Sequence, residues 1–201
     1  MENNFDLVLE TSRVHIFIKQ VLTEINDIKL INDYFFSFFY LYHGFCKLIN
    51  VIIYLHNNTE KSVKSKLEFP GYNLIDLAGF LKDIYKNIDE LMDKPACKKD
   101  YEYFCSKTFE DFIYLINYTG NVKQPYIRNK DYEQLLKKFI KNNNKKLRKN
   151  ILITMRGLSR MFTLANFGDA GKRPYIYLKE YGSLMDNQIG IKPENKTIKK
   201  D

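Results

Sequence analysis

The sequence predicts a mainly α-helical bundle with a short β-hairpin near the C-terminus. Over several long segments, apolar residues recur at intervals of three and four, the period of helices with one buried face. None of the 5 prolines in the 201 residues falls inside one of these segments. A hydrophobic content of 45% in a chain of this length is enough for one core, so we expect a single domain over residues 1–201.

The first predicted helix covers residues 4–31. Apolar residues from Leu7 to Ile28 follow the helical period, and no proline or glycine interrupts them. A strand over residues 14–18 is the alternative, because β-branched and aromatic residues cluster there. The longer period favours the helix.

The second predicted helix, residues 33–56, is the most apolar part of the chain. From Phe35 to Leu55 the only charged residue is Lys47. The run is about long enough to span a bilayer. However, Lys47 and His43 lie inside it, and no basic cluster marks one end. We therefore expect the buried central helix of a bundle and no membrane span.

A third helix is predicted over residues 74–92, after a polar loop at residues 57–73. Asn73 is a suitable N-cap residue, because its side chain can accept hydrogen bonds from the first free backbone N–H groups. Lys94 and Pro95 are expected to end the helix, since proline cannot continue one.

Two further elements complete the part outside the basic region. Thr108 and Asp111 have the spacing of a capping box and predict a helix that ends at Gly120. Near the C-terminus, residues 161–167 and 175–181 are expected to pair as the β-hairpin.

The most distinctive stretch, residues 131–167, is predicted to be a basic amphipathic helix on a core. Its apolar row has helical spacing and consists of Leu136, Ile140, Leu147, Ile151, Met155, Leu158 and Phe162. Six cations fall within about 100° of one another on roughly the opposite side of the helix. These are Lys138, Lys141, Lys145, Lys149, Arg156 and Arg160. Residues 142–144 are three asparagines, weak helix formers, so the sequence leaves open whether the helix breaks or bends there.

Charge is divided unevenly along the chain. Residues 1–120, the acidic and aromatic part, contain 13 Lys and Arg and 17 Asp and Glu, a net charge of −4. Residues 121–201 contain 19 and 7, a net charge of +12. This asymmetry indicates an acidic partner such as nucleic acid, or docking of one part of the chain on the other or on a second copy.

The six cations of the basic helix, with Lys172 and Arg173 in the turn that follows it, are the candidate residues for binding RNA or an acidic, nucleic-acid-associated protein. A solvated polar face is the simpler interpretation of the same residues, because lysine runs are common.

No sequence pattern predicts a cofactor, a metal or a catalytic site. The Gly171–Lys172 pair lacks the first glycine and the Ser or Thr of a phosphate-binding loop, since Asn166 and Arg173 occupy those places. The three histidines, His15, His43 and His56, fit no metal-ligand spacing. Three cysteines without a motif, and an acidic N-terminus without a signal-peptide pattern, lead us to expect a cytoplasmic protein.

In size, helix content and the apolar hairpin of residues 33–56 and 74–92, the chain resembles small helical phage-defence proteins of low-GC bacteria. The family it resembles is the abortive-infection V family, which is related to the HEPN helical bundles. The resemblance covers the general character of residues 1–120. HEPN ribonucleases carry an Arg-x4–6-His motif, and no arginine here has a histidine at that spacing. The resemblance implies a dimeric helical protein that binds a phage or translation component without cleaving RNA.

Together these features predict a non-enzymatic interaction protein, and the resemblance implies a homodimer acting in phage defence. Its basic C-terminal part would bind RNA or an acidic partner, which includes phage-encoded proteins. The alternatives are a nuclease whose site the sequence does not reveal, and a cofactor-free dimerising inhibitor or scaffold.

Overall fold

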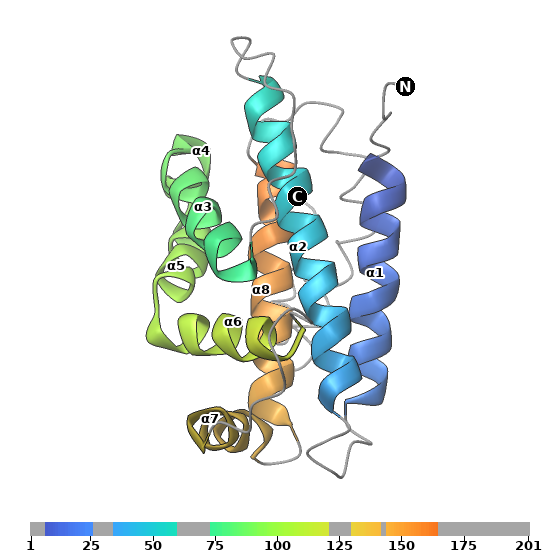
Figure 1. Cartoon of the computed structure of the whole chain (residues 1–201). Helices are drawn as coiled ribbons and strands as arrows, with labels where there is room; N and C mark the ends of the chain where they lie inside the picture. The colour runs from blue at the N-terminus through green and yellow to red at the C-terminus, as the bar shows by residue number, and fades with distance from the viewer. Residues whose placement is uncertain (1–6, 26–33, 60–72, 121–129, 142–143, 165–201) are drawn as a thin grey trace, which may run out of the picture.

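The computed structural model shows a helical bundle and describes residues 7–25, 34–59, 73–120, 130–141 and 144–164 (Figure 1). In chain order the helices are α1 (Leu7–Glu24), α2 (Tyr34–Thr59), α3 (Leu74–Lys86), α4 (Asp89–Met92), α5 (Pro95–Phe104), α6 (Lys107–Gly120), α7 (Lys130–Ile140) and α8 (Lys145–Leu164). The described residues contain no strand. The predicted helical fold class is therefore confirmed.

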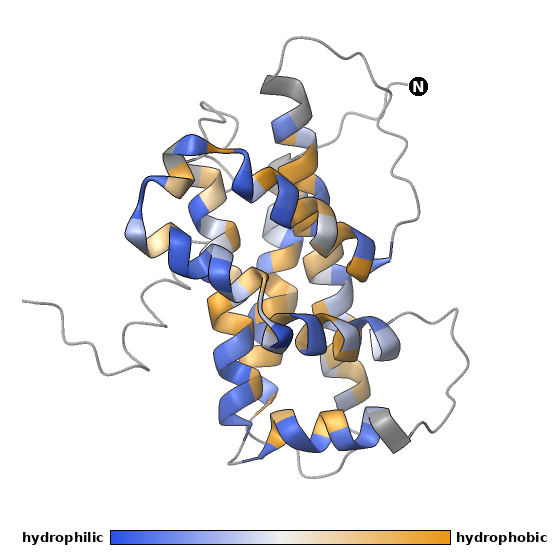
Figure 2. Cartoon of the chain, turned by 90° about the vertical axis from the view of Figure 1, so that its left-hand side faces the viewer, coloured by the Kyte–Doolittle hydropathy of each residue, from blue (hydrophilic) through white to orange (hydrophobic). Residues whose placement is uncertain are grey.

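Helix α2 is the centre of the bundle. It packs against α1, α3, α6 and α8. Its buried face is fully enclosed at Phe38, Leu41, Phe45, Leu48, Val51 and Ile52. In the described part of the chain it is also the one helix long and apolar enough to cross a membrane, and 50% of the apolar window is buried within the bundle. Figure 2 shows hydrophobic residues gathered on the inner faces of the helices.

Helix α1 and helix α3 differ in length from the predicted helices. Helix α1 begins at Leu7, and residues 26–31 of the predicted helix lie outside the described residues. Helix α3 has the predicted N-cap, because Asn73 Oδ1 accepts from the backbone N–H groups of Ile75 and Asp76 at 3.0 Å each. It ends at Lys86, and the short α4 follows, so the single predicted helix over residues 74–92 is wrong in its second half.

Helix α5 was not predicted at all. Pro95, expected to end a helix, instead begins one at its first position, where a missing N–H group costs nothing and the fixed φ suits the helix. Only three residues of α5 are buried, Cys97, Asp100 and Phe104. This apolar signal is too sparse for a periodicity argument to detect.

Helix α6 ends at Gly120 as predicted, but its N-cap is Ser106 and not Thr108. Ser106 Oγ accepts from the backbone N–H of Phe109 at 3.2 Å, and its own hydroxyl donates to the Tyr103 carbonyl at 2.7 Å. Ser106 thereby joins the end of α5 to the start of α6, which explains the tight turn between the two helices.

Helices α5 and α8 approach closely at Gly157. A Cβ atom added at Gly157 would lie 2.5 Å from Phe104 Cζ and 3.5 Å from Asp100 Cβ. A side chain there would push α5 away from α8. Gly157, a poor helix former inside α8, is thus a packing residue.

The C-terminal elements lie mostly outside the described residues. Of the expected β-hairpin, residues 161–164 form the last turn of α8, and the remainder falls beyond Leu164. Lys172 and Arg173 also lie outside the described residues.

Candidate anion-binding groove

The basic stretch is two helices, because the chain breaks after Ile140. Helix α8 begins at Lys145, and Asn144 between them has φ of 62°, a left-handed conformation that asparagine tolerates better than most residues. Asn144 is 2% exposed. Its side chain accepts from the Tyr34 hydroxyl and donates to the Ile25 carbonyl. Two buried hydrogen bonds therefore fix the corner at which α7 turns into α8.

A groove with a volume of about 790 Å³ lies at this corner. It is bounded by the start of α6, the end of α7, the start of α8 and one side of α5. Its lining residues are Lys99, Glu102, Tyr103, Ser106, Thr108, Lys138, Lys141, Lys145, Lys146, Lys149, Asn150 and Ile153. We call this feature the lysine groove. Figure 2 shows hydrophilic residues along the part of α8 nearest α7.

Six of the lining residues are lysines and one, Glu102, is acidic. Lys141, Lys145 and Lys149 are exposed, so their ammonium groups can reach a ligand in the groove. Helix termini of both signs border it, since α6 and α8 begin there while α5 and α7 end. The helix dipoles therefore largely offset one another, and the excess of lysines over acids decides the sign of the potential.

Lys138 is held at the edge of the groove by Asp111 of α6. Its ammonium donates to Asp111 Oδ2 at 2.8 Å, and Lys107 lies 3.3 Å from Oδ1. Partial burial acts to raise the pKa of Asp111, but the hydrogen bonds and charges of Lys138 and Lys107 outweigh it and lower that pKa. Asp111 is therefore ionised at neutral pH and draws one lysine away from the groove.

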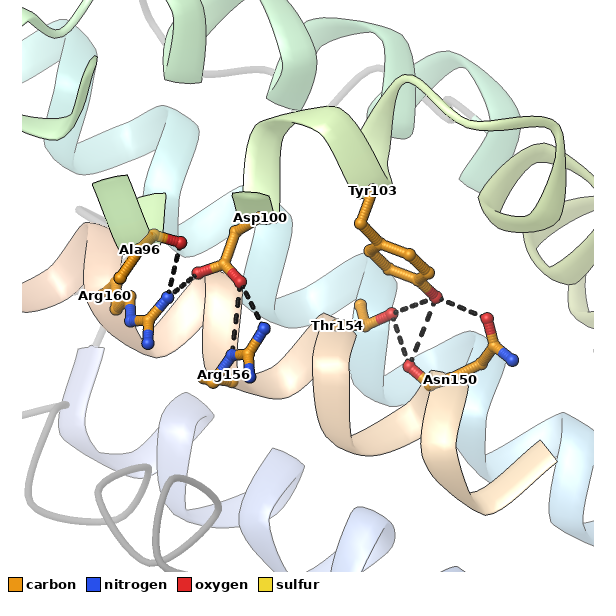
Figure 3. Close-up of polar contacts among 7 residues, drawn as sticks. All are labelled: Ala96, Asp100, Tyr103, Asn150, Thr154, Arg156 and Arg160. Carbon is orange, nitrogen blue, oxygen red and sulfur yellow. Dashed lines mark hydrogen bonds and ion pairs between the residues drawn. The ribbon is translucent and has the colours of Figure 1, made fainter. Parts of the chain in front are cut away.

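Tyr103 and Asn150 line the groove and are joined by hydrogen bonds between α5 and α8 (Figure 3), and we call this part of the lining the floor. The Tyr103 hydroxyl donates to Asn150 Oδ1 at 2.8 Å and lies 3.4 Å from Thr154 Oγ1. Asn150 Nδ2 in turn donates to the Lys146 carbonyl at 2.8 Å. Burial raises the pKa of Tyr103, while its hydrogen bond with Thr154 acts in the opposite direction. The phenol stays neutral and fixes the floor without adding negative charge.

Arg156 and Arg160, two of the six predicted cations, are committed to Asp100 (Figure 3). Asp100 has no exposed surface. Its Oδ1 accepts from Arg156 Nε at 3.2 Å and Nη2 at 2.7 Å, and its Oδ2 accepts from Arg160 Nη1. Arg160 also donates to the Ala96 carbonyl at 2.9 Å. These arginines bind α5 to α8, as the alternative of one part of the chain docking on another predicted.

The cations of α7 and α8 thus divide by chemistry. The arginines of α8 donate within the fold, and Arg148 follows the same rule by donating to the Leu22 carbonyl of α1 at 2.7 Å. Arginine suits such fixed, partly buried pairing because its donors form a rigid planar fork. Lys138 of α7 and Lys145, Lys146 and Lys149 of α8 face the groove, where flexible point charges can adjust to a ligand.

The structure brings four of the eight predicted site residues together in the groove: Lys138, Lys141, Lys145 and Lys149. Sequence reasoning missed Lys99, because α5 was not predicted. It missed Lys146, because a continuous helix places that residue off the basic face. A signal for the second was present, since the asparagine triplet favours the break that changes the register of α8.

The described residues contain no group of three or more His, Cys, Asp or Glu that could hold a metal ion. His43 lies in the ring cluster of α2, with its centroid 4.3 Å from that of Phe39. Burial, and next the charge of Lys47, lower the pKa of His43. His43 is therefore a half-buried imidazole that is neutral at neutral pH and packs against Phe39.

Comparison with family models, with characterised proteins and with solved structures finds no match to this chain. The resemblance to the abortive-infection V family stays an expectation from the sequence, and function has to be argued from the groove.

Proposed function

We propose that this chain is a non-enzymatic binding protein that holds RNA by its phosphates in the lysine groove. The observation that carries the proposal is the convergence of six lysines and a single carboxylate on one cavity of about 790 Å³. Clefts lined by one sign of charge concentrate the field and attract ions of the opposite sign.

Lysine contacts to phosphate give affinity that does not depend on sequence and falls with salt, because each neutralised phosphate releases condensed counterions. The lysines available here differ from the set predicted by the helical wheel. Lys99 and Lys146 join the four predicted groove lysines, while Arg156 and Arg160 stay out of the interaction because Asp100 already holds them.

The proposal is tested by measuring the fluorescence anisotropy of a labelled single-stranded RNA over a range of salt concentrations. The groove variant combines Lys141→Gln, Lys145→Gln and Lys149→Gln. The matched control combines Lys19→Gln, Lys86→Gln and Lys98→Gln, three exposed lysines outside the groove. Both variants lower the net charge by the same amount, so a difference between them reports the groove alone.

We expect the groove variant to weaken RNA binding by at least about tenfold and to flatten the slope of log K against log salt by about 2, three contacts at about 0.7 each. The control should stay within about twofold of the native chain. Equal losses in the two variants would show that only overall charge matters. An absence of RNA binding at low salt would point to the acidic protein partner, which a nuclease-treated pull-down would then recover.

The cellular setting expected from the sequence, phage defence, belongs to this proposal. Phage plating on cells that express the native chain or the groove variant tests it, and protection should depend on the groove. Gel analysis of the same RNA after incubation separates binding from the rival nuclease activity, since binding alone leaves the RNA intact.

A further inference from the structure

We infer that the lysine groove recognises a compact polyphosphate, as found at the 5′-triphosphate end of an RNA or in a free nucleoside triphosphate, in preference to internal phosphodiesters. This inference rests on the proposed function, because it names the phosphate chemistry that the same groove selects.

Positive charge is concentrated around the groove and does not extend along α8. The lysines reach the groove from three helices and one turn: Lys99 from α5, Lys138 from α7, Lys141 from the turn that follows α7, and Lys145, Lys146 and Lys149 from α8. Beyond Lys149 the next cations of α8, Arg156 and Arg160, are bound to Asp100. In the described part of the chain, α8 therefore offers no continuing basic track for a strand with one charge per nucleotide.

The groove gives nucleic-acid bases little surface to bind. Proteins that hold single strands use aromatic rings on which successive bases stack. Among the described residues, Tyr103 is the one aromatic residue lining the groove, and its ring packs against Phe104 and Phe109 with centroids 5.9 and 5.3 Å away. Its hydroxyl is occupied by Asn150. The floor therefore contributes shape but no stacking platform, and recognition depends on phosphate.

The density of positive charge in the groove matches a ligand with several adjacent phosphates. Six lysines and one glutamate line the cavity, and because Asp111 pairs with Lys138, an excess of four positive charges remains. A polyphosphate places several negative charges on adjacent phosphorus atoms, so one ligand meets many of these lysines at short range, where Coulomb attraction is strongest. A phosphodiester brings a single charge into the same volume. The groove therefore favours the ligand with adjacent phosphates.

Lys146 is one of two groove lysines that contacts within the fold hold in place. Its ammonium lies 5.0 Å from the centroid of the Phe139 ring, a cation–π contact. Lys138 is likewise held by Asp111. With these two lysines restrained in the free chain, Lys99, Lys141, Lys145 and Lys149 form the exposed face that meets the ligand first.

The experiment uses one RNA sequence with a 5′-hydroxyl or a 5′-triphosphate, measured by anisotropy without divalent metal. Inorganic tripolyphosphate and a nucleoside triphosphate serve as competitors. We expect the 5′-triphosphate RNA to bind at least about tenfold tighter than the 5′-hydroxyl RNA. Tripolyphosphate should displace both. A variant with Lys145→Gln and Lys149→Gln should lose most of the difference between the two RNAs, whereas one with Lys86→Gln and Lys98→Gln should keep it.

The competitors identify the source of the polyphosphate. If the nucleoside triphosphate displaces the labelled 5′-triphosphate RNA at or below the concentration of that RNA, the groove is assigned to free nucleotides. If a higher concentration of nucleotide is needed, the groove is assigned to RNA ends. Both results support the inference. Equal binding of the two RNAs overturns it and leaves the proposed function intact, since the groove then reads the backbone. Failure of the native chain to bind either RNA or tripolyphosphate overturns both.

Discussion

The replacement Asp100→Asn tests whether Arg156 and Arg160 are structural. It keeps the size of the side chain and removes the charge that both guanidinium groups share. Asp100 has no exposed surface, whereas Arg156 and Arg160 keep 23% and 28% of theirs. The variant thus leaves two positive charges, partly enclosed between α5 and α8, without a counter-ion.

The magnitude follows from the geometry. Removing one partner of a buried ion pair costs about 3–5 kcal/mol. The two arginines can recover some hydration through their exposed fraction, which reduces the loss, and the new amide still accepts one or two hydrogen bonds of about 1 kcal/mol each. We therefore expect Asp100→Asn to lower the free energy of unfolding by about 2–4 kcal/mol.

The assay is urea unfolding, in which the midpoint should fall while the slope m stays constant. Asp93→Asn is the control, since Asp93 is an exposed acid next to α4 and its replacement should change stability by no more than about 0.5 kcal/mol. RNA affinity of folded Asp100→Asn should match the native chain. A stability loss equal to that of the control would refute the structural role assigned to the arginines.

Three further predictions concern packing, the corner between α7 and α8, and pH. Gly157→Ala should lower the midpoint of thermal unfolding, because the added Cβ has no room. Gly79→Ala should raise the midpoint, since nothing lies within 4 Å of its added Cβ and alanine is the better helix former by about 1 kcal/mol. A higher midpoint for both variants would contradict the close approach of α5 to Gly157. Asn144→Ala should lower the free energy of unfolding in urea by about 2–4 kcal/mol, since it removes two buried hydrogen bonds from a left-handed position. It should also weaken RNA binding. A variant as stable as the native chain would exclude Asn144 as the residue that fixes the corner. The lowered pKa of Asp111 predicts a contribution to the free energy of unfolding that is present above its ordinary pKa of 3.8 and is lost as pH falls below that value. Asp111→Asn should lack this loss. Curves of stability against pH that have the same shape for both chains would argue against the pair with Lys138.

The helical fold could be predicted from the sequence because most of its helices have a strong apolar period. The row from Leu136 to Phe162 is an example, since all of its members are buried except the half-buried Ile140. Helix α5 has no such row. Its one clear signal is Pro95, and proline has opposite meanings at the start and the end of a helix. The third predicted helix extended too far because the buried apolar row continues past Lys86 to Ile88 and Leu91, while Asn87 alone marks the end of α3.

The candidate site could be predicted only in part, because a helical wheel gives the direction of a side chain but not what covers it. Arg156 and Lys149 lie on the same predicted face, yet α5 covers one and leaves the other exposed. The deciding residue is Asp100, 56 positions from Arg156, in a segment where no helix was predicted. Tertiary contacts of this kind are not encoded in local periodicity.

The most direct test of the lysine groove is lysine acetylation footprinting by mass spectrometry, with and without bound 5′-triphosphate RNA. Each lysine reports its own accessibility, so the bound surface is mapped on the native chain. The groove predicts protection of Lys141, Lys145 and Lys149, with Lys19 and Lys86 modified at the same rate in both states. Protection of Lys19 and Lys86 while the groove lysines stay reactive would contradict the assignment of the groove as the phosphate site.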